Sequence, residues 1–361
     1  MPIAHNALKA SFEKLDHDLA WLMDGFAEVL RELGEGDLAD RLPWRATAPA
    51  IETLPDHRLE RYLQVLSIAF QLLNMVEENA AAQSRRGIEG THGPTVEPGG
   101  FGHTIKHLLA SGVDAEAIKA ELPSIQLEPV FTAHPTEAKR ATVLEQHREL
   151  YLLLVSRENQ MWTPAEQNAI REQVKGVLER LWRTGEIFLA KPDIASERRG
   201  VLHYLRDVFP HVLPSIDRRL GDAWAASTGR PAEELADIDQ LPTLTFGNWV
   251  GGDRDGHHLV TATVTAQTLR DLRESALQIL RNRLQQLGSS LSLSCRLQEI
   301  PYDLRTALAA AGAGALGEAG EQALARNPQE PWRQFVNVML ARLPDGSPDA
   351  PGRYRHPREL A

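Results

Sequence analysis

Apolar residues recur every three or four positions along most of this chain, the spacing that places them on one face of an α-helix. The first such pattern consists of Leu8, Phe12, Leu15, Leu19, Leu22, Phe26, Val29 and Leu33. Because Gly34 and Gly36 follow it, the pattern predicts a long helix that ends there and packs through a narrow apolar seam. A second long helix is predicted by Leu59, Leu63, Leu66, Phe70 and Leu73.

Further helical patterns fill much of the remaining chain. Thr163-Pro164-Ala165-Glu166 is a capping box with proline at the first helical position, which predicts a helix reaching about Leu189. Helices also fit residues 196–226, 261–287, 301–311 and 331–343, and residues 309–320 form a weak helix or a loop. The glycine- and proline-rich residues 87–102 predict a linker between an N-terminal helical region, 1–86, and a third region, 103–361.

Two short apolar stretches depart from the helical period. Residues 125–132 predict a buried strand, which Pro135 stops before a helix begins near Thr136. Residues 241–250 predict a second strand, followed by a polar loop and a long helix from about Thr261. In a parallel βα barrel, such strand-to-helix corners lie at the rim where catalytic groups are placed.

His134 lies at the first of these corners, just before the helix that carries Lys139 and Arg140. A helix start offers free backbone N–H groups, and an imidazole titrates near neutral pH, so the corner suits anion chemistry. A histidine that only hydrogen-bonds a backbone carbonyl remains the alternative.

The second corner is the loop Gly251-Gly252-Asp253-Arg254-Asp255-Gly256. Its glycines allow close approach to a ligand, and the planar fork of Arg254 suits carboxylate or phosphate. Asp253 and Asp255 could orient that arginine; the alternative is a tight turn in which one of them simply pairs with it. The spacing is not that of a calcium-binding EF-hand, and His257-His258 lacks zinc-site spacing.

At these residues the chain resembles the phosphoenolpyruvate carboxylase family. Residues 132–137, with Arg140 and Thr142, resemble the family's first active-site signature. Residues 249–256, with residues 260–262, resemble the second, and weaker similarity extends over residues 181–187 and 326–328. The resemblance spans most of the chain but covers only the family's N-terminal part.

The resemblance implies a mostly α-helical α/β chain that forms the N-terminal part of a TIM-like (β/α) barrel enzyme with many extra helices. The family places its metal-binding carboxylates, a catalytic lysine and a second arginine loop in a longer C-terminal portion. We therefore expect a fragment or N-terminal half, with an incomplete barrel of two to four strands within residues 103–361. An open barrel exposes apolar strand edges and favours self-association unless a partner covers them.

The activity implied by the resemblance is carboxylation of phosphoenolpyruvate by bicarbonate, which yields oxaloacetate and phosphate and feeds the tricarboxylic acid cycle. It uses Mg²⁺ or Mn²⁺, whose ligands we expect outside this chain. His134 is the expected base that takes the carboxyphosphate proton, since its ordinary pKa of about 6.5 suits that transfer. The expected partner is the missing C-terminal half or a homo-oligomer, a tetramer by resemblance.

The remaining site residues take supporting roles in this reading. Arg140 and Arg254 would attract phosphate and carboxylate oxygens, and Trp249 would form an apolar wall that retains CO₂. We expect Thr136 to cap its helix, and Asp253 and Asp255 to orient neighbours instead of binding metal.

The chain departs from the family pattern at several positions. Ala141 stands where a second basic residue usually follows Arg140, and His257-His258 replace the usual Asn-Pro. Gly185 and Phe188 stand where the family typically has Asp and Arg. These changes leave the expected fold intact but put substrate handling in doubt.

Composition limits which binding partners and which cellular compartment we expect for this protein. A net charge of −10 argues against nucleic-acid or acidic-membrane binding. No apolar run is long enough to cross a bilayer, and the single cysteine, Cys295, agrees with a reducing cytoplasm. Two other functions stay open: a non-catalytic helical module, and a metal-dependent phosphate-ester hydrolase that uses His134 with the Asp253/Asp255 loop.

Overall fold

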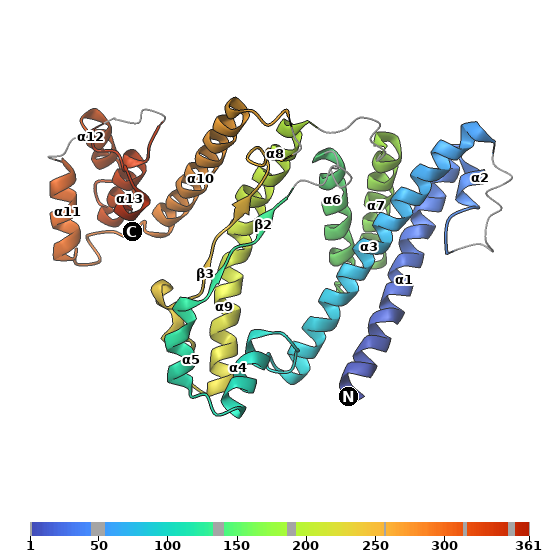
Figure 1. The fold of residues 1–361 in the computed structure, drawn as a ribbon, viewed down its shortest axis with the longest axis horizontal. Helices are drawn as coiled ribbons and strands as arrows, with labels where there is room; N and C mark the ends of the chain where they lie inside the picture. The colour runs from blue at the N-terminus through green and yellow to red at the C-terminus, as the bar shows by residue number, and fades with distance from the viewer. Residues whose placement is uncertain are drawn as a thin grey trace. The chain divides into compact units, whose positions relative to one another are not determined.

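The computed structural model describes residues 2–44, 55–132, 141–185, 193–255, 258–312, 316–345 and 351–360. These residues are mostly helical, as the sequence predicts (Figure 1). The chain divides into two compact units, one formed by Met1–Asp193 with Ser215–Gly247 and the other by Ile194–Pro214 with Asn248–Ala361. Within the described ranges, no helix is both long and apolar enough to cross a membrane.

Most of the first unit is helical. Its helices are α1 (Pro2–Glu32), α2 (Gly36–Ala39), α3 (Asp56–His92), α4 (Phe101–Ala110), α5 (Ala115–Glu121), η2 (Leu122–Ser124), α6 (Ala141–Arg157), α7 (Pro164–Thr184), η4 (Ala232–Leu235) and η5 (Ile238–Gln240). The predicted capping box of α7 is present, with Thr163 and Glu166 bonded reciprocally. The helix stops at Thr184 because Gly185 adopts φ 71°, so the predicted end near Leu189 is wrong.

The second unit contains α8 (Ile194–His203), η3 (Tyr204–Val208), α10 (Ala262–Ser290), α11 (Tyr302–Gly312), α12 (Glu318–Ala325), α13 (Pro331–Arg342) and η6 (Pro357–Glu359). Helix α9 (Phe209–Thr228) crosses the boundary between the units. The helices predicted over 261–287, 301–311 and 331–343 are therefore confirmed, whereas α4 and α5 had no predicted counterpart.

The single helix predicted over 196–226 is interrupted by η3, a π-helical turn in which Phe209 N–H bonds to Tyr204 O. Prolines explain the interruption. Pro210 has no N–H to continue the α-helical ladder, and Pro214 leaves the carbonyl of Pro210 without its usual helical donor. Arg283 of α10 donates to that carbonyl instead, which anchors α10 to this part of the second unit.

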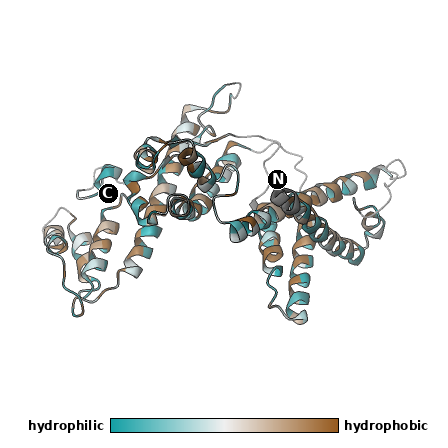
Figure 2. Cartoon of the chain, turned by 90° about the horizontal axis from the view of Figure 1, so that it is seen from below, coloured by the Kyte–Doolittle hydropathy of each residue, from teal (hydrophilic) through white to brown (hydrophobic). Residues whose placement is uncertain are grey.

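Helices α1, α3, α6 and α7 share one hydrophobic core. The apolar residues of α3 form two stripes, and the stripe formed by Tyr62, Val65, Ala69, Leu72 and Val76 is buried. Leu59, Leu63 and Phe70, which marked this helix in the sequence, are 40%, 49% and 51% exposed. Along the helices, hydrophobic and hydrophilic segments alternate in Figure 2, as amphipathic helices require.

A buried carboxylate ties α1 to the end of α6. Asp18 is fully buried and pairs with Lys14 Nζ at 2.8 Å and with Arg157 Nη2 at 3.0 Å. Burial lowers the pKa of Lys14, but its hydrogen bonds to Asp18 and Glu158 outweigh this effect and hold that pKa above its ordinary value. The Arg157 guanidinium also lies 4.5 Å from the centre of the Trp21 ring, so one cluster joins charge and packing.

Both predicted strands form, but they are shorter and more exposed than expected. Strand β1 (Gln126–Leu127) lies parallel to β3 (Thr243–Leu244), and β2 (Val130–Phe131) pairs with β4 (Gly247–Asn248). The prediction of a buried strand over 125–132 is wrong, because Leu127 and Val130 are 54% and 46% exposed. Pro129 divides the stretch, and a parallel ladder this narrow leaves its apolar side chains uncovered.

We predict that Asp18→Asn lowers the free energy of unfolding by about 3 kcal/mol, because it leaves the partly buried Arg157 without its carboxylate. Urea denaturation followed by circular dichroism measures the change. Glu13→Gln is the matched control on the same helix, since the Lys9–Glu13 pair is exposed and its loss should cost at most about 0.5 kcal/mol. Equal losses in the two variants would contradict the role given to burial.

Candidate functional site

The parallel ladder brings the ends of the two motif-bearing strands to the same edge. Thr243 N donates to Ile125 O at 2.9 Å, Thr245 N to Leu127 O at 2.9 Å, and Gly247 N to Pro129 O at 3.0 Å. The pairing advances by two residues on each side, so the strands stay in parallel register up to the start of both motifs. Thr132 and Trp249, the first residues of the two motifs, directly follow β2 and β4 in the sequence.

The first motif itself lies outside the described residues. His134, Thr136 and Arg140 fall within residues 133–140, and Phe188 falls within residues 186–192. Their expected roles therefore stay predictions. Gly185 is described, and its structural role is clear: it ends α7 in a backbone conformation that favours glycine.

The second motif forms a compact loop bonded to itself. The Asn248 side chain forms two hydrogen bonds to the backbone of Val250. Its Oδ1 accepts from Val250 N–H at 2.9 Å, and its Nδ2 donates to Val250 O at 3.0 Å. Gly252 N and Asp253 N both donate to Trp249 O at 2.9 Å, and Asp255 N donates to Asp253 Oδ1 at 3.0 Å. Hydrogen bonds within the loop therefore define a turn, and Trp249 at its start is 56% exposed.

Gly251 holds this loop against α10. It adopts φ +76°, which favours glycine, and a Cβ atom at this position would lie 2.2 Å from Thr268 Oγ1. Thr268 itself is only 3% exposed. The close approach therefore requires glycine at 251 for two independent reasons, backbone conformation and space.

Arg254 is exposed and rests on the same helix. Its Nη2 lies 3.5 Å from Thr265 Oγ1, a long hydrogen bond to a neutral partner. Among the described residues, Arg254 forms no ion pair with Asp253 or Asp255; the Asp253 carboxylate instead accepts from Asp255 N–H. The guanidinium consequently keeps a charge available for an anion.

The Asp253 carboxylate takes part in the turn of the loop, since one of its oxygens accepts a backbone N–H. In the part of the chain that the structure describes, no three His, Cys, Asp or Glu side chains gather at one point.

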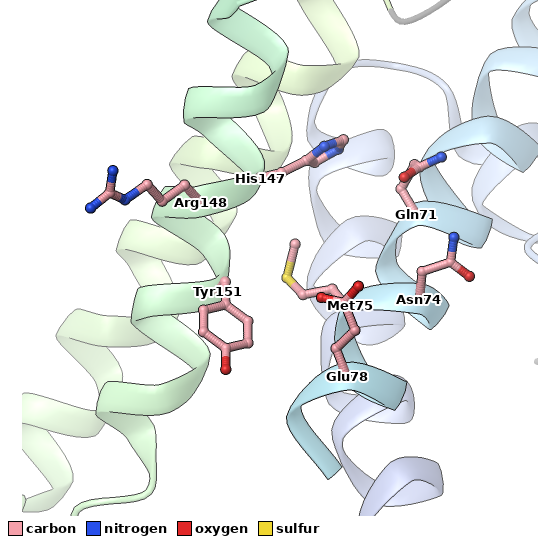
Figure 3. A pocket seen from close by; sticks show the side chains of 7 residues that line it. All are labelled: Gln71, Asn74, Met75, Glu78, His147, Arg148 and Tyr151. Atoms are coloured by element: carbon pink, nitrogen blue, oxygen red, sulfur yellow. The ribbon is translucent and has the colours of Figure 1, made fainter. Parts of the chain in front are cut away.

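A separate pocket lies between α3 and α6 in the first unit (Figure 3). It has a volume of ≈ 300 Å³ and is lined by Gln71, Asn74, Met75, Glu78, His147, Arg148 and Tyr151. In the close-up, His147 points across the pocket towards α3. None of the described residues expected at the site, Trp249, Asp253, Arg254 and Asp255, lines it, so this pocket is distinct from the motif loop.

Comparison with known proteins bears on both motifs. The sequence profile of the phosphoenolpyruvate carboxylase family matches residues 31–355, a span that includes both strand-to-helix corners. The chain belongs to the phosphoenolpyruvate carboxylase family. The resemblance carried by the motifs is therefore confirmed over nearly the whole chain.

Three curated members of the phosphoenolpyruvate carboxylase family illustrate the extent of similarity. The protein of Methylorubrum extorquens is 35% identical over 313 residues, 85% of this chain and 32% of the relative. That of Xanthomonas oryzae is 33% identical over 302 residues, 83% of this chain and 32% of the relative. That of Roseiflexus castenholzii is 32% identical over 322 residues, 88% of this chain and 33% of the relative. The chain thus spans about a third of the length of these relatives.

Sequence reasoning missed the residues beneath the phosphoenolpyruvate carboxylase motif loop. Thr268 and its neighbour Arg198 lie outside both motifs. In the sequence, Thr261, Thr265 and Thr268 recur at helical spacing from the N-cap of α10 into its second turn. Threonine is a poor residue for a helix interior, so this recurrence was the available signal.

We predict that Gly251→Ala destabilises the loop by at least about 2 kcal/mol, because positive φ and the overlap with Thr268 both oppose a Cβ. Amide hydrogen exchange at residues 252 and 253 reports the loss. Gly252→Ala is the matched control, since its Cβ would come no closer than 3.7 Å to Trp249 O. Protection that survives in Gly251→Ala would contradict the close approach.

Proposed function

We propose that this chain supplies part of the active site of a phosphoenolpyruvate carboxylase, which converts phosphoenolpyruvate and bicarbonate to oxaloacetate and phosphate. The observation that carries the proposal is the parallel pairing of the two strands that directly precede the family motifs. Parallel strands place such segments together at the carboxyl edge, where βα enzymes assemble their sites. The parallel strands would belong to an eight-stranded TIM-like barrel completed by the family portion that this chain does not span.

His134 is the proposed base of this reaction. Bicarbonate attacks the phosphoryl group of phosphoenolpyruvate, forming carboxyphosphate and an enolate. The imidazole then takes the carboxyphosphate proton, which releases CO₂ and phosphate beside the enolate carbon that forms the new bond. A base with a pKa near neutrality is best matched to this transfer.

The loop on α10 would provide the anion-binding part of the site. Arg254, resting on neutral Thr265, presents a full positive charge to phosphate or carboxylate oxygens, and Arg140 would add a second. The half-exposed Trp249 offers an apolar surface that would retain CO₂ once other elements cover it. Thr136 would cap the following helix, and Asp253 would keep the turn closed through Asp255 N.

The remaining requirements of the reaction extend past these residues. We propose that Mg²⁺ or Mn²⁺ is held by ligands from the part of the relatives that this chain does not span. We also propose that the complete enzyme assembles as a homotetramer. The alternative of a metal-dependent phosphate-ester hydrolase is less supported, because the carboxylase family profile matches residues 31–355.

A hybrid enzyme tests the proposal. Residues 1–361 replace the matching third of the Methylorubrum extorquens relative, and phosphate release from phosphoenolpyruvate is measured with and without bicarbonate. We predict bicarbonate-dependent release, which His134→Ala lowers by about 10²–10⁴-fold in kcat. His103→Ala, an exposed histidine on α4, is the control and should retain full activity.

Arg254→Ala in the same hybrid should lower kcat/KM by about 10- to 100-fold, because it removes a charge-assisted hydrogen bond to substrate. A hybrid that folds but releases no phosphate with bicarbonate would count against the carboxylase. Release that does not depend on bicarbonate would favour the hydrolase, and activity unaffected by His134→Ala would remove that residue from the mechanism.

A further inference from the structure

Two arginines of the second unit meet α10 on one face, a helical turn apart. Arg254 from the loop contacts Thr265, and Arg198 from α8 lies 3.4 Å from Thr268 Oγ1 through its Nη1. Residues three apart on a helix share a face, so the motif loop and α8 converge on the same stretch of α10. Only the first of these arginines belongs to a family motif.

The Arg198 side chain is held in place by an ion pair with Asp271. Its Nε lies 2.7 Å from Asp271 Oδ2, and the two side chains are 16% and 22% exposed. Asp271 is held in turn by Gln267 Nε2, which donates to its other oxygen at 2.6 Å. The charge of Arg198 is therefore neutralised by its partner, which suits a supporting role and not substrate binding.

Thr268 transmits this support to the loop. Its hydroxyl donates to Val264 O at 2.9 Å and accepts from Arg198, so both hydrogen-bonding capacities of the buried group are used. The same Oγ1 faces Gly251 at the point where a Cβ would lie at 2.2 Å. A chain of contacts thus runs from Asp271 through Arg198 and Thr268 to the first turn of the loop.

The direction of Arg254 matters because the loop carries two carboxylates for one guanidinium. If the loop moved, Arg254 could pair with Asp253 or Asp255 and lose its attraction for an anion. Seated on α10, it contacts Thr265 instead. The position of the loop therefore decides whether its net effect on a bound anion is attractive.

We propose that Thr268, supported by Arg198 and Asp271, is a positioning residue for the loop that carries Arg254. The inference depends on the proposed function only for its consequence, the binding of phosphoenolpyruvate. The placement of the loop depends on contacts within the second unit alone, so the two can be tested separately.

The experiment compares Thr268→Val, which keeps the shape and removes the hydroxyl, with Thr268→Ser, which keeps the hydroxyl. Amide hydrogen exchange at Gly252 and Asp253 should become about fivefold faster in Thr268→Val and stay unchanged in Thr268→Ser. Arg198→Met should resemble Thr268→Val. Arg273→Met, an exposed arginine of α10, should resemble the wild type.

Titration of the hybrid enzyme carrying the same substitutions with phosphoenolpyruvate gives the second readout. We expect its Kd to rise about fivefold in Thr268→Val and to recover in Thr268→Ser. Unchanged loop exchange in Thr268→Val, equal effects of Val and Ser, or faster exchange throughout α10 would each overturn the proposal. Faster loop exchange with no phosphoenolpyruvate binding by the hybrid enzyme would uphold the positioning role and contradict the proposed function.

Discussion

The parallel pairing between residues 125–129 and 243–247 is the constraint on which the proposed site depends. Three backbone hydrogen bonds join segments that are remote in the sequence, and they fix the register up to the first residues of both motifs. Parallel strands cannot be joined by a tight turn, so the chain between them must return through helices. Helices α6 and α7 lie within that return and pack into the core of the first unit.

The second unit shows how a short loop is given a defined position. The loop has few side chains to bury. Hydrogen bonds within its own backbone hold it together, and its buried Gly251 packs against Thr268. The support below it is polar: a threonine, an arginine and a carboxylate that satisfy one another. Such a network holds direction as well as distance, which an apolar contact alone does not.

The first unit contains both a well-buried charge cluster and exposed apolar strand residues. Asp18, Lys14 and Arg157 bury charge within a well-packed helical core, where each partner compensates another. The strands next to the proposed site instead leave Leu127 and Val130 uncovered. In most parallel sheets, side chains of this kind are covered on both faces.

The sequence by itself determined most of the long helices and the identity of the motif loop. Periodic apolar residues, the Thr163 capping box and the glycines near residue 34 are local signals. They predict helices well because the hydrogen bonds of a helix are formed between residues close in sequence. Both apolar stripes of α3 have helical spacing, so the neighbours that pack on the helix decided which stripe is buried. Packing neighbours likewise decided how far the strand residues are exposed. Tertiary structure alone placed Arg198 and Thr268 next to Gly251, because Arg198 is far from the motif in sequence and Thr268 meets Gly251 only when the loop folds against α10.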